Sequence, residues 1–430
     1  MFTQAKKIVL ALFMLSPFMA EAATLPTPAI ANSPGVSIHF TRGNTKDLDM
    51  MAAAGIKIVR TDFVWGDIET QKGVYNWASY DELVNNLVKR GMRPYFILDY
   101  SNVLYEDVHI LTTSDGTPYA AYIDSPNSPN SVAGFAAWAK AAALRYQSKN
   151  VIWEIWNEPN LTFWKPTPNI EDYTTLSKAT CSAIHGAVPN ATVVGGVTSK
   201  FDWNFLFAYS GSGVLDCIDA VSVHPYRSTA PETAGAEISY LQWVIDQYAP
   251  SNRTGKIPVI SGEWGYTTQT GAYPLEYQAA YAVRMQLNNL IYNVPISIWY
   301  DWKNDGTDAA NKDQNFGIVT ASLALKPAYT ALKTLSQQLG SYKLVNRVAT
   351  GNDQDYVLVF ANSLGKRKVV AWTTGDSYAT TILPQMTTST AGIKVPVVSM
   401  MAANSTALIN ATGLPITLSY APQYIDLSKL

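Results

Sequence analysis

The sequence predicts an α/β fold in which a (β/α)8 TIM barrel is followed by a small antiparallel β-sandwich. Eight short apolar runs alternate with amphipathic stretches over about 300 residues, the rhythm of βα units in a closed parallel sheet. No Gly-rich turn follows an early strand, as an open doubly wound sheet would normally have. After about Gly340 the pattern changes to short β-rich runs between Gly, Asn, Asp and Ser. We therefore expect a barrel over residues 23–339 and a sandwich over residues 340–430.

The first 22 residues resemble a secretory signal peptide. Two lysines precede the apolar run Ile8–Ala20, and a small-residue cleavage pattern ends at Ala22. A membrane anchor is the alternative, but the run has about 13 residues where about 20 are needed, and Pro17 interrupts it. We expect cleavage after Ala22 and export to the periplasm or the medium. No later stretch is long enough to be a transmembrane segment.

Short apolar runs, several of them β-branched, mark the barrel strands, and helical periodicity with capping residues marks the helices between them. Asn44 opens the first expected helix, Gly55 closes it, and Gly91 stops the second. The expected strands are Val36–Phe40, Ile56–Phe63, Arg93–Tyr100, Val151–Trp156, Thr192–Val197, Ala220–Tyr226, Pro258–Trp264 and Ile296–Trp302. The expected helices are Asn44–Gly55, Trp77–Arg90, Val132–Tyr146, Ile170–Ala187, Phe201–Tyr209, Ala234–Tyr248, Leu275–Asn293 and Lys326–Leu339.

Two further regions differ from the βα rhythm. The segment Ser101–Asn130 is too long for an ordinary connection, and we expect it to shape a cleft on the face where barrel enzymes carry their active sites. The sandwich strands are expected at Lys343–Val348, Tyr356–Ala361, Lys368–Thr373, Ala379–Leu383, Ile393–Val398 and Pro415–Tyr420. Because this region has no clear aromatic cluster, we expect it to pack on the barrel and not to bind sugar independently.

Composition excludes several classes of partner. With 31 Lys+Arg against 33 Asp+Glu and no basic block, nucleic acid is not expected as a partner. We also expect the protein to be a monomer. Four dispersed histidines form no metal motif, and the acidic stretch 301–308 has Lys303 where a calcium loop needs an oxygen, so we expect neither metal nor cofactor. Cys181 and Cys217 can form one disulfide in an exported chain, or remain two buried thiols.

Two glutamates at expected strand ends carry the chemistry. Glu158 follows an apolar strand that Pro159 terminates, and Glu263 ends a second strand 105 residues later. Tryptophans near Glu158 should raise the pKa of its carboxyl, as a general acid requires. Seven of the chain's 12 tryptophans follow predicted strands, which suits a groove where sugar rings stack: Trp65, Trp156, Trp164, Trp203, Trp264, Trp299 and Trp302. Two strand-end glutamates in such a setting indicate a glycosidase.

Other polar residues of the expected strands should support this pair. Arg60 is a charge within an apolar strand and must find a partner, for which Glu263 is a candidate. His224 and Tyr226 lie at the end of another strand, where they can hydrogen-bond a carboxylate or a sugar hydroxyl.

Together, four motifs resemble those of the (β/α)8 retaining glycoside hydrolases: Trp-Asn-Glu-Pro at 156–159, Gly-Val-Tyr-Asn-Trp at 73–77, His-Pro-Tyr at 224–226 and Ser-Gly-Glu-Trp at 261–264. Within that clan the chain is most similar to family 39, including members that accompany bacterial exopolysaccharide synthesis. The resemblance covers residues 36–339. It implies Glu158 as acid/base, Glu263 as nucleophile, and Asn157 as a donor to the sugar 2-hydroxyl. It also implies supporting roles for Arg60, His224, Tyr226 and Trp299, and Trp65 and Trp264 are further candidates for substrate contact.

The mechanism expected of this pair is double displacement with retained configuration. Glu263 attacks the anomeric carbon while Glu158 protonates the leaving oxygen, and Glu158 then activates the water that hydrolyses the glycosyl ester. The expected substrate is a polysaccharide, cut internally. Two alternatives stay open: an exo-acting β-xylosidase with a closed pocket, and a catalytically silent polysaccharide-binding barrel.

Overall fold

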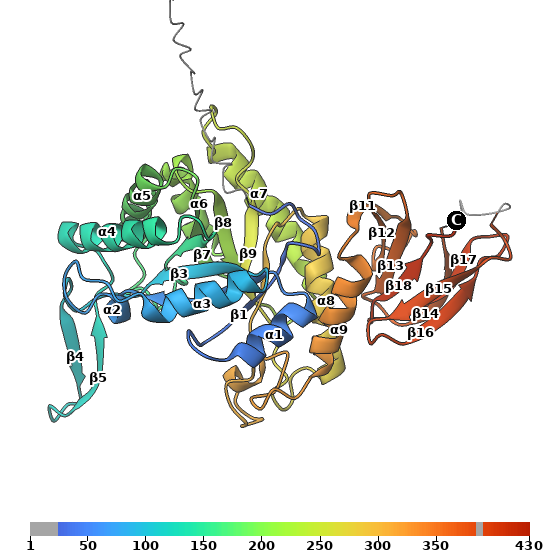
Figure 1. Ribbon diagram of the computed structural model, residues 1–430, viewed down its shortest axis with the longest axis horizontal. Helices are drawn as coiled ribbons and strands as arrows, with labels where there is room; N and C mark the ends of the chain where they lie inside the picture. Colours follow the sequence, from blue (N-terminus) through green and yellow to red (C-terminus); the bar gives the residue numbers. More distant parts are fainter. Residues whose placement is uncertain (1–24, 384–389) are drawn as a thin grey trace, which may run out of the picture.

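The computed structural model describes residues 25–383 and 390–430, so the expected signal peptide lies outside the described residues. Eight parallel strands close into a barrel in the order β1-β10-β9-β8-β7-β6-β3-β2, as the sequence predicts (Figure 1). Its strands are β1 Pro34–Ser37, β2 Ile58–Val64, β3 Arg93–Asp99, β6 Ile152–Ile155, β7 Thr192–Ser199, β8 Ala220–His224, β9 Val259–Trp264 and β10 Ser297–Trp299.

Helices surround the barrel, and most bury one face, whereas α8 is buried on nearly all sides. They are α1 Thr45–Ala54, α2 Trp65–Ile68, α3 Ala78–Lys89, α4 Pro129–Arg145, α5 Ile170–Ala187, α6 Trp203–Gly211, α7 Gly235–Tyr248, α8 Leu275–Ile291 and α9 Pro327–Leu339. In α3, Leu83, Val84 and Leu87 recur at helical spacing and are buried. Gly55 ends α1 at φ 87°, a left-handed conformation that glycine adopts without strain. The short α2 was not predicted.

The barrel interior has two chemically different layers. Its lower layer is apolar: Ile58, Tyr95, Ile152, Val194, Ala220, Ile260, Ile296 and Ile298 pack together. Because side chains alternate along a strand, the residue two positions after Ile58 or Ile152 also faces inward. Those residues are Arg60 and Glu154, both buried. The strands therefore place charged groups directly above an apolar floor, toward their carboxyl ends.

The long excursion after β3 forms a hairpin that the sequence did not predict. Its strands are β4 Val108–Thr112 and β5 Pro118–Ile123, and the pair extends away from the barrel at the lower left of Figure 1. Tyr119 in this hairpin is exposed. Tyr105, before the hairpin, instead stacks on Trp65 at 4.8 Å and therefore belongs to the packing around α2.

The chain after α9 forms antiparallel sheets. Six strands pair in the order β11-β12-β13-β18-β15-β16, and β14 pairs with β17 in a separate sheet. The bounds are β11 Lys343–Val348, β12 Asp355–Ala361, β13 Arg367–Thr373, β14 Tyr378–Ile382, β15 Lys394–Ser399, β16 Asn404–Leu408, β17 Leu414–Leu418 and β18 Gln423–Asp426. Polar β16 and short β18 were not predicted. Val357, Val369 and Ile425 of the large sheet pack with Ile382 and Leu414 of the small one.

The opposite face of the large sheet packs on the barrel. Trp372 Nε1 donates to Glu232 at 2.8 Å, and Glu232 also accepts two 2.7 Å bonds from Arg284 in α8. Tyr420 stacks on Tyr277 of α8 with ring centroids 4.4 Å apart. Charged and aromatic contacts therefore join the C-terminal sheets to the barrel. Packing on the barrel was expected, because this region has no aromatic cluster with which to bind sugar independently.

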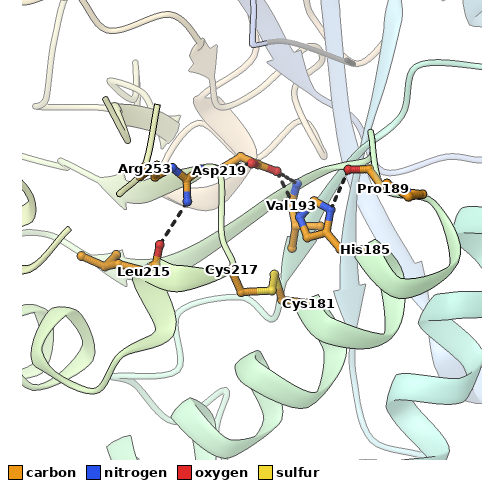
Figure 2. Close-up of a disulfide and its surroundings, with 8 residues drawn as sticks. All are labelled: Cys181, His185, Pro189, Val193, Leu215, Cys217, Asp219 and Arg253. Carbon is orange, nitrogen blue, oxygen red and sulfur yellow. Dashed lines mark hydrogen bonds and ion pairs between the residues drawn. A yellow bond between two sulfur atoms is a disulfide. The ribbon is translucent and has the colours of Figure 1, made fainter. Parts of the chain in front are cut away.

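The two cysteines are joined in a disulfide, which connects α5 to the segment before β8 (Figure 2). Figure 2 also shows His185 beside it, with Nε2 3.4 Å from Asp219 Oδ2. Hydrogen bonding to that carboxylate raises the pKa of His185. Across the described ranges, no helix has the length and apolar character needed to cross a membrane.

Candidate active site

Glu158 and Glu263 meet at the carboxyl end of the barrel. Glu158 follows β6 in a left-handed conformation at φ 42°, and Glu263 lies in β9. A carboxylate oxygen of each, together with a ring nitrogen of His224, lies within 4.8 Å of the others. Retaining glycosidases need carboxyl groups about 5 to 5.5 Å apart, whereas inverting enzymes need about 6.5 to 9.5 Å to admit a water. The observed spacing fits the retaining arrangement.

Arg60 is the buried centre of the site. Its Nη1 donates to Glu263 Oε2 at 2.6 Å, as the sequence suggested. Its Nε and Nη2 both donate to Glu154 Oε1, at 2.8 and 2.6 Å, and Nη2 also donates to Asn157 Oδ1 at 3.0 Å. Burial works against the charge of Arg60, but the two carboxylates outweigh it and raise the pKa of Arg60. The guanidinium therefore stays charged and fixes three acidic or amide groups at once.

Both oxygens of Glu263 are held by donors. Arg60 binds Oε2, and the Tyr226 hydroxyl donates to Oε1 at 2.8 Å. Donors to a carboxylate favour its charged form. Burial, reinforced by the neighbouring charge of Glu263, raises the pKa of Tyr226, so the phenol keeps the proton that it donates. This arrangement suits a nucleophile, which must be ionised and correctly oriented.

Glu158 has a different partner. Arginine can only donate, so His224 Nε2, 3.3 Å from Arg60 Nη2, faces it as an acceptor. The His224 proton then lies on Nδ1, which donates to Glu158 Oε1 at 2.9 Å. Burial raises the pKa of Glu158, but the hydrogen bond from His224 opposes it, and the pKa lies below its ordinary value.

The lowered pKa of Glu158 corrects the expectation that neighbouring tryptophans raise it. Trp153, Trp156 and Trp164 are buried in the main core cluster of the barrel. Trp153 packs on Phe96 at 5.9 Å. Their apolar surface packs against other core side chains, and the hydrogen bond from His224, one of the contacts that the sequence allowed for, decides the direction of the shift.

Gly262 makes room for the charged layer. A Cβ atom there would lie 2.1 Å from Ser222 Oγ and 3.1 Å from Glu154 Oε2. Any larger residue would push against both groups, so the position beside Glu263 requires glycine for close approach.

A cavity of 240 Å³ opens over the two glutamates. Glu158, Glu263, Asn157 and Arg60 line it, so the structure brings these predicted residues together around one space. Its aromatic walls are Tyr100, Phe163 and Tyr300, with Phe163 43% exposed. Tyr100 and Phe163 stack with centroids 6.1 Å apart. The Asn157 amide nitrogen contacts the Tyr100 hydroxyl at 3.4 Å.

The catalytic cavity lacks the expected tryptophan walls, although Trp302 lines an adjoining hollow of 280 Å³. Of the seven tryptophans, only Trp203 is not fully buried; the others are in the core, and none lines the cavity. Trp65 donates to Glu69 at 2.6 Å, Trp299 donates to the Phe316 carbonyl at 3.2 Å, and Trp264 lies under the Arg227 guanidinium. Trp65, Trp264 and Trp299 belong to the main hydrophobic core. Substrate contact by these three rings therefore lacks support.

Several site residues were missed. Glu154 is fully buried and accepts from Arg60 and from the Tyr95 hydroxyl at 2.5 Å. Its signal was available, since a lone charge in an apolar strand needs a partner just as Arg60 does. His39, Tyr100 and Tyr300 lie at the ends of predicted strands, where their position at the catalytic edge was the available signal, whereas Phe163 lies outside every predicted element and had none.

Three groups of described residues have metal-ligand spacing. One consists of Glu158, His224 and Glu263. The second contains Cys181 and Cys217, whose sulfurs are joined to each other. The third is His39, Asp301 and Asp305, beside the cavity. The acidic stretch 301–308, which does not fit a calcium loop by sequence, contributes two members of this group.

Fold and site together define a retaining (β/α)8 glycoside hydrolase of clan GH-A. Residues 21–306 match the family model described as cellulase, glycosyl hydrolase family 5, and the chain belongs to that family.

Three similar proteins share 22% or less of their sequence with this chain. A β-xylosidase of Caldicellulosiruptor saccharolyticus is 22% identical over 326 residues, which are 67% of this chain and 64% of that enzyme. A family 39 glycoside hydrolase from Bacteroides cellulosilyticus WH2 superposes with a TM-score of 0.77 at 22% identity, covering 92% of this chain and 81% of that one. A GH39 β-xylosidase from Caulobacter crescentus gives 0.62 at 17% identity, covering 95% and 98%. At such identities the structural likeness establishes the fold.

Proposed function

We propose that this protein is a retaining β-glycosidase of the family 39 type that hydrolyses β-xylosidic or closely related bonds. The observation that carries the proposal is that one carboxylate oxygen of Glu158 lies within 4.8 Å of one of Glu263, while the two groups have different partners. Arg60 and Tyr226 donate to the two oxygens of Glu263, whereas Glu158 accepts a hydrogen bond from His224. Asn157 is positioned to donate its amide to the sugar.

The substrate class rests on the relatives. The curated relative is a β-xylosidase, and solved structures with the same fold include two β-xylosidases and two xylanases. A family 39 assignment within clan GH-A is supported by the high structural similarity to the Bacteroides enzyme and stands beside the family 5 match.

A second candidate function is cleavage within a polysaccharide, such as a bacterial exopolysaccharide, and one observation favours it. A hollow of 290 Å³ shares His39, Thr61 and Asp62 with the catalytic cavity. Another, of 280 Å³, shares Ser37, Ile38 and His39 with it. Adjoining hollows suit a chain that extends beyond the reacting sugar, whereas an exo-acting enzyme needs only a closed pocket.

The test is hydrolysis of an aryl β-xyloside and of xylan by the wild-type protein and by Glu158→Gln and Glu263→Gln. We expect activity with retained anomeric configuration in the first product, and at least a thousandfold loss in Glu263→Gln, about 4 kcal/mol of transition-state stabilisation. Because the pKa of Glu158 is lowered, activity should fall as pH rises from the acidic side. Full activity in either variant would contradict the mechanism. Release of monosaccharide alone from xylan supports exo action, and a shortening of the polymer supports internal cleavage.

We further propose that the protein works outside the cytoplasm as a monomer. Residues 1–22 have the signal-peptide pattern, and a disulfide such as that of Cys181 and Cys217 is typical of oxidising compartments. Cell fractionation tests the location, and light scattering of the purified protein tests the oligomeric state.

A further inference from the structure

The 280 Å³ hollow beside the catalytic cavity has an acidic wall. Ser37, Ile38 and His39 line both spaces, so the hollow adjoins the position of the reacting sugar. On its other side are Asp301, which follows β10, and Asp305 in the next loop. A sugar unit next to the cleaved bond would therefore reach these carboxyl groups.

Asp301 is buried without a hydrogen-bond partner. It is 1% exposed, and neither of its carboxylate oxygens makes a hydrogen bond. The neighbouring Lys326 is engaged elsewhere, because its Nζ donates to Thr268, Asn304 and Asn315. Burial, then the charge of Asp305, raises the pKa of Asp301. A buried carboxyl without a partner is costly, and a bound donor would relieve that cost.

Three side-chain atoms that can accept a hydrogen bond converge on this point, His39 Nε2 when its ring is neutral. His39 Nε2 lies 3.7 Å from Asp301 Oδ2, and one atom each of His39, Asp301 and Asp305 lies within 4.8 Å of the others. Burial raises the pKa of Asp305, and Lys303, whose Nζ pairs with Asp47 at 3.3 Å, opposes this only in part. His39 and Asp305 are exposed, so the group is open to a ligand.

Two kinds of cation set different spacings. A primary ammonium bound at about 2.8 Å places three tetrahedrally arranged acceptors about 4.6 Å apart. A zinc ion bound at about 2.0 to 2.1 Å would draw them to about 3.3 Å. His39 Nε2 and Asp301 Oδ2 are 3.7 Å apart and all three atoms lie within 4.8 Å of one another, so the spacing admits either cation. The position of the group beside the catalytic cavity favours a cation that the substrate itself carries.

We propose that His39, Asp301 and Asp305 bind the protonated amino group of a sugar next to the cleaved bond, so that the substrate is a glycan containing unacetylated amino sugars. This inference rests on the proposed hydrolysis at Glu158 and Glu263. An N-acetyl group lacks the charge and two of the three N–H donors. A hydroxyl offers one donor and no charge.

Binding of three β-1,4-linked tetrasaccharides to the Glu158→Gln protein tests the proposal by calorimetry at pH 6 and low salt. Their units are glucosamine, glucose and N-acetylglucosamine, which differ only at C2. We expect the glucosamine tetramer to bind at least about tenfold more tightly than the other two, by the usual strength of hydrogen bonds to charged groups. Added Asp305→Asn should remove this preference and leave affinity for the glucose tetramer unchanged. Asp308→Asn, an exposed change in the same loop outside the hollow, is the matched control and should keep the preference.

Equal affinities for the three tetramers would overturn the inference, as would a preference that survives Asp305→Asn. Stoichiometric Zn²⁺ binding that Asp305→Asn abolishes, without any preference among the sugars, would assign the group to a metal instead. Hydrolysis of the aryl β-xyloside by wild-type protein is measured in parallel. Activity together with equal affinities refutes only the amino-sugar site, whereas absent activity refutes the proposed function and leaves the binding preference to be judged by itself.

Discussion

Replacement of Glu154 by glutamine isolates the buried charge beneath the catalytic pair. Glu154 is fully buried and does not line the catalytic cavity, and its Oε1 accepts two bonds from Arg60. The amide keeps the shape but removes the charge, and its nitrogen would meet the Tyr95 hydroxyl that now donates to Oε2. Arg60 would retain only Glu263 as an ionic partner.

The magnitude follows from burial. Breaking a buried ion pair by removing one partner costs about 3 to 5 kcal/mol. Because Glu263 still pairs with Arg60, we expect the lower end, about 3 kcal/mol of unfolding free energy. Without the charge of Glu154, Arg60 should bind Glu263 more strongly. Glu263 then becomes a weaker nucleophile, and kcat should fall more than KM changes.

Urea unfolding and steady-state kinetics on an aryl β-xyloside measure both effects. The control is Glu237→Gln, which breaks a 2.9 Å pair with Arg227 in which the Glu237 side chain is 40% exposed. This change should cost at most about 1 kcal/mol and leave kcat unaltered. If Glu154→Gln unfolds at the wild-type urea concentration with unchanged kcat, the buried charged layer does not have the role assigned to it.

Three other changes test neighbouring parts of the structure. In His224→Ala, loss of the hydrogen bond that favours ionised Glu158 leaves burial to raise the pKa of Glu158, so the alkaline limb of the kcat/KM profile should move to higher pH; a limb that stays in place would contradict this. Gly262→Ala should lower kcat at least about tenfold and destabilise the barrel by about 1 to 3 kcal/mol, since the new Cβ has no space, whereas unchanged kinetics would show that the layer can shift. Cys181→Ser with Cys217→Ser opens a crosslink spanning 36 residues and should lower the unfolding free energy by about 3 to 4 kcal/mol without a change in KM; an equal urea midpoint would show that the crosslink does not stabilise the fold.

The sequence determined the barrel and its two glutamates because those features are written in local pattern. Strands such as 152–155 and 259–264 are short apolar runs, and their polar ends mark the catalytic edge. The spacing of helical apolar residues located α5 at its observed bounds, Ile170–Ala187. Polar strands without such a pattern, notably β16, were not predicted.

Tertiary structure alone decided how the site works, because its contacts join residues far apart in the chain. The sequence suggested that Arg60 meets Glu263, 203 positions away, but not that Arg60 also binds Glu154, 94 positions away, because no periodicity encodes which carboxylate faces which donor. The bond from His224 to Glu158 reversed the pKa direction that apolar neighbours suggested. Tryptophans expected at the groove are buried, because composition reveals that a ring is large and apolar but not which side of the strand it packs against.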